Sequence, residues 1–211
     1  MSQDKFIHTR PDDALIVPVI EGLFGEYSAR YGDYFAKHKE EDPLSAYAQP
    51  DGDFIVLLRD GRPIAMGAYK RYDETTAELK RIWTDSTLRR QGLAQKVVQE
   101  LETLALNNGY TRVYLTTGFR QPEAVQLYLS LSYEPQFDIN ADRESLALPP
   151  HDGRLRFIKP LTRVAAAVEL ATHQPDVADL AVVTELTDVA DNEDVIDHKV
   201  SHKSVTEKAY E

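Results

Sequence analysis

The stretch from Glu78 to Ala94 reads ELKRIWTDSTLRRQGLA, and it joins the end of an expected strand to the start of an expected helix. The strand covers residues 75–84 and closes a run of three antiparallel strands, the first two linked by the turn dipeptide Asp60-Gly61. The helix is indicated by apolar residues that recur at helical spacing over residues 93–105. The stretch therefore predicts a strand, a basic loop and a helix in direct succession.

The loop of this stretch has the chemistry of an anion site. The first N–H groups of a helix are unpaired and carry partial positive charge. Gly92 has no Cβ, so a ligand can approach the backbone closely, and Arg89 and Arg90 add full charges. The loop matches neither the Gly-Lys-Ser/Thr phosphate loop nor the three-glycine dinucleotide motif. We interpret it as a phosphate or pyrophosphate site; the alternative is an arginine-rich helix start on a solvated surface.

The sequence on either side predicts a sheet with helices packed on it. The other expected elements are strands at residues 5–9, 53–59, 63–72, 111–117 and 154–159 and helices at residues 14–30 and 122–131. Antiparallel hairpins followed by alternating strands and helices indicate an α/β or α+β fold.

Composition excludes several classes of protein. The chain of 211 residues has no cysteine, which excludes disulfides, cysteine-bound zinc and a thiol nucleophile. Its net charge of −11 and pI near 5.0 argue against nucleic-acid binding. Apolar runs are too short for a membrane span, and the N-terminus lacks the apolar core of a signal peptide. We therefore expect a cytoplasmic protein with no membrane or nucleic-acid partner.

Charge also divides the chain into two parts. Residues 161–211 hold four basic and eleven acidic residues, no glycine and one aromatic side chain. Such a segment is unlikely to build a core of its own. We expect a domain at residues 1–160 and an acidic C-terminal tail at residues 161–211 that is flexible or partly helical. His198 and His202 in this tail have helical spacing, but we expect no metal site there.

A second motif, QPEAVQLY at residues 121–128, stands at the start of the helix expected after the next strand. Together, the Arg-x-x-Gly-x-Ala loop and this motif resemble the pyrophosphate loop and the Asn-x-x-Ala-x-x-Leu-Tyr helix of the GNAT superfamily of N-acetyltransferases. The resemblance extends over residues 6–160 and implies a mixed, mostly antiparallel central sheet flanked by helices. It departs from the family pattern at Gln121, where asparagine is usual, and at Ser132, where glycine is usual.

The resemblance implies acetyl-CoA as the acetyl donor and gives roles to particular residues. The strand segment that pairs with the pantetheine arm, the pyrophosphate loop and the start of the second motif comprise ten expected cofactor-binding residues: Ile82, Trp83, Thr84, Arg89, Arg90, Gln91, Gly92, Leu93, Ala94 and Gln121. Tyr128 matches the tyrosine that protonates the departing thiolate. The alternative for Tyr128 is a core aromatic on an amphipathic helix.

Glu78 is the candidate base, because some members of the superfamily carry a glutamate four residues before the pantetheine-pairing segment. Strand alternation places Glu78, Lys80 and Ile82 on one face and Leu79, Arg81 and Trp83 on the other. The alternative for Glu78 is a carboxylate paired with a neighbouring cation of the sheet.

The expected function is acetyl-CoA-dependent N-acetyl transfer to a primary amine of a small metabolite or a protein, by direct attack in a ternary complex. Tyr27, Arg30, Tyr31 and Tyr34 are candidates for the wall of an acceptor pocket. The alternative function is a non-catalytic acyl-CoA-binding module with a partner-docking tail. A homodimer is an expected assembly, because dimers are common in this superfamily.

Overall fold

The computed structural model describes residues 3–33 and 42–162, so the predicted tail from residue 163 onward, Tyr34 and both tail histidines lie outside the described residues. The sheet has seven strands in the order β1-β2-β3-β4-β5-β7-β6. In chain order, the elements are β1 (Asp4–His8), α1 (Val17–Tyr31), η1 (Leu44–Tyr47), β2 (Asp53–Arg59), β3 (Arg62–Arg71), β4 (Thr76–Thr84), η2 (Ser86–Leu88), α3 (Leu93–Asn107), β5 (Arg112–Gly118), α4 (Pro122–Ser130), β6 (Glu134–Pro135), η3 (Ser145–Ala147) and β7 (Arg154–Pro160). Every described helix is too short or too polar to cross a bilayer.

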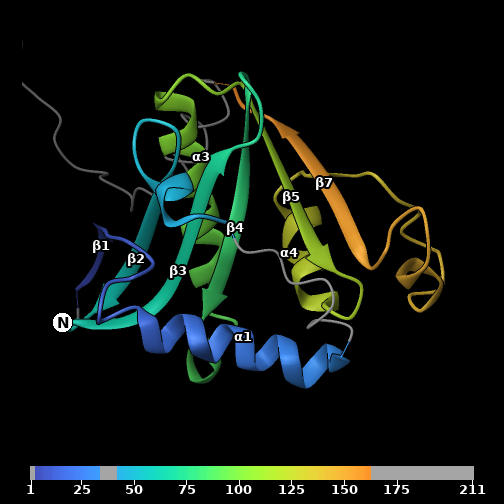
Figure 1. Cartoon of the computed structure of the whole chain (residues 1–211), viewed down its shortest axis with the longest axis horizontal. Helices are drawn as coiled ribbons and strands as arrows, with labels where there is room; N and C mark the ends of the chain where they lie inside the picture. Colours follow the sequence, from blue (N-terminus) through green and yellow to red (C-terminus); the bar gives the residue numbers. More distant parts are fainter. Residues whose placement is uncertain (1–2, 34–41, 163–211) are drawn as a thin grey trace, which may run out of the picture. The chain divides into compact units, whose positions relative to one another are not determined.

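The prediction of a mixed, mostly antiparallel sheet flanked by helices is confirmed (Figure 1). β4 and β5 form a parallel pair, whereas the other neighbouring strands are antiparallel. Their pairing is short: it joins Thr76–Leu79 to Arg112–Leu115. Beyond these four pairs, the two strands separate, and Figure 1 shows them diverging toward α1.

Helices cover both faces of the sheet. Along β2, Phe54 and Val56 pack in a cluster with α1, whereas Ile55 and Leu57 pack in the larger cluster that contains α3. Such burial on both faces explains the nearly continuous apolar run of this strand. α3 approaches β3 so closely that a Cβ at Gly67 would lie 2.7 Å from a methyl carbon of Val97.

The alternation predicted for β4 is wrong after Lys80, because the strand has a bulge. Arg81 has a left-handed φ of 59°, and the β3–β4 register shifts opposite it, between Met66 and Ala68. The extra residue returns Ile82 to the face of Leu79, where it packs in the α3-side cluster. It also moves Trp83 to the opposite face, in the cluster with α1.

A buried cluster of charged and polar side chains joins β7, α3 and the segment after α4. Lys159 of β7 donates a hydrogen bond to Glu102 of α3 at 2.7 Å, and both side chains are 9% exposed. The hydroxyl of Tyr133, just after α4, donates to the other carboxylate oxygen at 2.6 Å. Each buried charge is therefore neutralised by a partner from a distant part of the sequence.

Replacing Lys159 with methionine is expected to lower the free energy of unfolding by about 3–5 kcal/mol, because Glu102 then stays buried without its counter-charge. Urea denaturation measures the effect. The matched control is the double variant Glu102→Leu/Lys159→Met, which removes both charges and is expected to be more stable than the single variant. Equal loss in the two variants would contradict a compensating pair.

Candidate active site

A cavity of about 230 Å³ opens where β4 and β5 separate. β4 contributes residues 79–82 to its wall, and β5 contributes residues 116–118. Tyr27 and Tyr31 of α1, two of the candidates for an acceptor wall, lie on one side, and Tyr128 of α4 lies on another. The short parallel pairing thus creates a partly apolar, partly charged space at the middle of the sheet.

Tyr128 combines burial with access to this cavity. Its side chain is 5% exposed, and its ring lies 5.5 Å from that of Tyr133 and 5.6 Å from that of Phe157. Burial raises the pKa of the Tyr128 phenol, and the neighbouring Tyr27 raises it further. Its hydroxyl therefore keeps its proton at neutral pH, as a proton donor requires.

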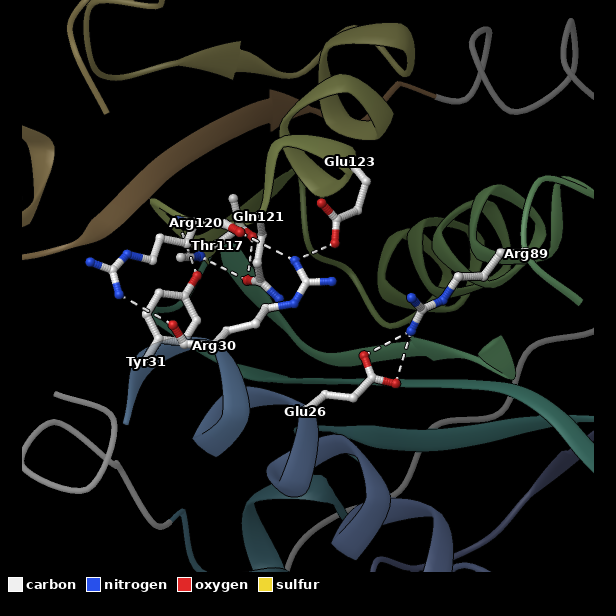
Figure 2. Close-up of polar contacts among 9 residues, drawn as sticks. Glu26, Arg30, Tyr31, Arg89, Thr117, Arg120, Gln121 and Glu123 are labelled. Atoms are coloured by element: carbon white, nitrogen blue, oxygen red, sulfur yellow. Dashed lines mark hydrogen bonds and ion pairs between the residues drawn. The ribbon is translucent and has the colours of Figure 1, made fainter. Parts of the chain in front are cut away.

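Gln121 lines the same cavity and fastens the end of β5. Its Oε1 accepts hydrogen bonds from the Thr117 hydroxyl at 2.9 Å and from the Gly118 N–H at 3.0 Å (Figure 2). The residue that departs from the family pattern thus braces the strand end, and its amide also hydrogen-bonds Tyr27. At the other departure, Ser132 adopts a left-handed φ of 62°, a conformation in which glycine is less strained.

Glu78 lies on β4 beside the cavity, but it is not among the described residues that line it. Its carboxylate is buried and pairs with Lys70 and Lys80, each at 3.3 Å. Asp42 extends the group, since it also bonds Lys70, at 2.5 Å, and accepts from the Tyr47 hydroxyl at 2.7 Å. The structure therefore shows the paired carboxylate, and the role of Glu78 as a base stays a prediction.

The predicted pyrophosphate loop lies outside the cavity wall, at the start of α3. Arg90 and Gly92 both adopt left-handed conformations, with φ of 63° and 73°. A Cβ at Gly92 would meet no described atom within 4 Å, so the space over this backbone is open as far as the described residues go. None of the described side chains caps α3, which leaves the N–H groups of its first turn available to a ligand. These features fit an anionic group.

The two remaining strand residues of the predicted site differ in environment. Trp83 is partly buried against the α1-side cluster. The hydroxyl oxygen of Thr84 is buried and has no hydrogen-bond partner among the described residues. From Lys80 to Thr84, the pairing with β5 has ended, so the backbone edge of β4 that faces away from β3 is open to an added strand.

α1 contacts both the predicted pyrophosphate loop and the start of α4. Glu26 accepts from Arg89 at 2.8 Å through both carboxylate oxygens (Figure 2). At the C-terminal end of α1, the Tyr31 hydroxyl accepts from the Arg120 N–H at 3.1 Å, and Arg30 pairs with Glu123 at 2.5 Å. A Cβ at Gly118 would lie 2.1 Å from the Tyr31 oxygen, so this packing requires glycine.

Sequence reasoning missed several residues of the cavity. Lys80, Arg81 and Arg154 bring positive charge to its lining. Arg154 follows a long irregular segment with no local pattern that points to a site. Arg81 could have been noticed as a charged residue within a β-rich run. The alternation of the strand does not, however, predict the position of the bulge that orients it. In the described part of the chain, no group of three or more His, Cys, Asp or Glu side chains is arranged to hold a metal ion.

Residues 20–133, just over half of the chain, match the Acetyltransferase (GNAT) family, and the chain belongs to this family. It is 32% identical over 101 residues to the N-acetylaspartate synthetase of Danio rerio, a match that covers 46% of this chain and 36% of that protein. The chain therefore matches about a third of the length of this curated relative.

Solved structures share the fold. A Klebsiella pneumoniae protein assigned as an acyl-CoA N-acyltransferase superposes with a TM-score of 0.58 at 20% identity, over 76% of this chain and 99% of that one. The N-acetylglutamate synthase of Neisseria gonorrhoeae, solved with coenzyme A and N-acetyl-glutamate, gives 0.51 at 14% identity, over 77% of this chain and 36% of that one. Enzymes of this family use acetyl-CoA as donor.

Replacing Glu26 with glutamine is expected to tighten binding of coenzyme A about twofold to fivefold, because it releases Arg89 from an exposed ion pair worth up to about 1 kcal/mol. Calorimetric titration measures the change. Glu21→Gln, at an exposed position of the same helix, is the control for the lost negative charge. Unchanged affinity in the Glu26 variant, or equal tightening in both, would show that the pair does not compete with the ligand.

Proposed function

We propose that this chain is an acetyl-CoA-dependent N-acetyltransferase that acetylates a primary amine by direct attack in a ternary complex. The observation that carries the proposal is the separation of β4 and β5 beside Tyr128, next to an uncapped helix start with an open left-handed glycine. A cytoplasmic location and a homodimer complete the proposal.

The donor is proposed to lie along the open edge of β4, with Ile82, Trp83 and Thr84 offering backbone groups to the pantetheine arm. Arg89 to Ala94 and Gln121 are the other proposed contacts. The first N–H groups of α3 and the charge of Arg90 favour the pyrophosphate, because both place positive charge at a site with room for it. Arg89 joins them once it leaves Glu26.

The reaction transfers two protons while one bond forms and another breaks. The acceptor nitrogen forms a bond to the thioester carbonyl carbon, and the carbon–sulfur bond breaks. Tyr128 is proposed to give its proton to the departing thiolate, which fits a buried phenol at the cavity that remains protonated. Glu78 is proposed to receive the amine proton, directly or through water, since it lies beside the cavity residue Lys80.

The acceptor is proposed to be a small amine rather than a protein. The named products of two relatives, N-acetylaspartate and N-acetyl-glutamate, are acetylated small molecules. The cavity of about 230 Å³ supports this choice, because α1, α4 and two strands contribute to its lining and its volume suits a small molecule. The ion pairs that hold Glu78 favour a second candidate, a non-catalytic acyl-CoA-binding module. Turnover separates the two.

Replacing Gly92 with glutamate is expected to abolish detectable acetyl-CoA binding in calorimetry, because it adds bulk and negative charge where the pyrophosphate is proposed to lie. The matched control is Gly109→Glu at the other end of α3, since Gly109 also has a left-handed φ and open space. The control shares the backbone strain and is expected to bind normally. Retained affinity in the Gly92 variant would remove the loop from the site.

Replacing Tyr128 with phenylalanine is expected to lower kcat about 100-fold while the affinity for acetyl-CoA stays nearly constant, because only proton donation is lost. Release of free thiol measures kcat, and calorimetry measures affinity. Tyr110→Phe removes a buried hydroxyl away from the cavity and is the matched control. An unchanged kcat would reject the acid role, and binding without any turnover in the wild-type protein would favour the binding module.

A further inference from the structure

Arg81 is a cavity residue whose charged group lies against aromatic rings. Its guanidinium lies 4.9 Å from the ring centre of Tyr47 and 5.7 Å from that of Phe24. Within the described residues, Arg81 makes no ion pair with a carboxylate. Lys80, by contrast, is paired with Glu78 at 3.3 Å and lies 3.8 Å from Asp42. Among the described residues, Arg81 thus brings to the cavity a charge that is not paired with a carboxylate.

The backbone at Arg81 is strained. A left-handed φ of 59° at a long, non-glycine residue is costly, and such outliers concentrate at functional sites. The bulge directs Arg81 toward the α1 face, where burial raises the pKa of the Tyr27 and Tyr47 phenols and the charge of Arg81 opposes that rise. A neutral side chain would fill the same space without burying a charge.

Stacking leaves the hydrogen-bonding edge of a guanidinium available. The Arg81 guanidinium carbon lies over the rings of Tyr47 and Phe24, and a ring contact needs none of the N–H donors, which form a fork that matches the two oxygens of a carboxylate. Two described carboxylates of this region have other partners: Asp42 bonds Lys70 and Tyr47, and Glu78 bonds Lys70 and Lys80. As far as the described residues go, the edge is therefore available for an anion brought by a ligand.

We infer that Arg81 binds a carboxylate of the amine acceptor, so that the acceptor is an amino acid or a similar amine bearing a carboxylate. The inference rests on the proposed function, because it assigns the cavity to the acceptor. It also opposes the expectation from net charge: a chain with a charge of −11 would steer cations toward itself, whereas the described residues of the cavity lining include three basic residues and one acidic residue. The local charge determines what the cavity binds.

The test compares matched acceptors with acetyl-CoA as donor. Glycine, L-aspartate and L-glutamate are each assayed by thiol release beside the same compound with its carboxylates replaced by primary amides. Spermidine and phenethylamine represent amines without a carboxylate. The variants are Arg81→Gln, Arg81→Lys and the control Arg112→Gln, which lies on β5 and is not among the cavity residues. Calorimetry with acetyl-CoA is run on every variant.

The expected result is turnover of at least one carboxylate-bearing acceptor and a marked loss with its amide. Arg81→Gln should raise KM for that acceptor about tenfold or more, with kcat and acetyl-CoA affinity little changed. Arg81→Lys should recover part of the loss, because it restores charge without the fork, and Arg112→Gln should behave as wild type.

Three outcomes would overturn the inference while leaving the proposed function intact: acids and amides used equally, turnover confined to the amines without a carboxylate, or an Arg81→Gln protein with unchanged KM. Binding of acetyl-CoA without acetylation of any carboxylate-bearing probe also rejects it. A loss of acetyl-CoA affinity in Arg81→Gln would assign the residue to the donor instead. Failure of the wild-type protein to bind acetyl-CoA would reject the proposed function first.

Discussion

The parallel pairing of β4 with β5 ends after four residue pairs, and the rest of the site depends on that short contact. Beyond Leu79 and Leu115, the strands separate, which leaves one edge of β4 without a strand partner and opens a cavity between the strands. Backbone N–H and C=O groups at such an edge have no strand partner, so they can form hydrogen bonds with an extended ligand. Tyr128 of α4 and Gln121, the residue before α4, line the cavity, as do Tyr27 and Tyr31 of α1.

Two further features shape the surroundings of this opening. The bulge at Arg81 turns Ile82 into the α3-side core and frees the α1 face of β4 for charged and aromatic side chains. α1 then runs crosswise to the strands, with Glu26 on Arg89 and Tyr31 on the Arg120 N–H (Figures 1 and 2). The helix therefore contacts residues on both sides of the opening, and we expect its ion pair with Arg89 to compete with an anion at the loop.

Much of this architecture could be predicted from the sequence, because its signals are local. Apolar residues at helical spacing predicted α3, and the Asp60-Gly61 dipeptide predicted a hairpin. Two motifs predicted the loop before α3 and the start of α4. The bulge could not be predicted, since it depends on register with β3 rather than on the residues around Arg81, and so the faces of Ile82 and Trp83 were assigned wrongly. One partner of Glu78 also comes from another strand, since Lys70 lies on β3, and Asp42, which bonds Lys70, precedes η1.

Amide hydrogen exchange with and without acetyl-CoA tests whether the donor lies along the open edge of β4, because it reports which backbone groups the donor protects. We expect slower exchange at Ile82–Thr84 and in the first turn of α3, residues 93–95, with β1 unchanged as an internal reference. Binding that leaves both segments unprotected, or protects a different part of the chain, would contradict a donor held at the open edge of β4.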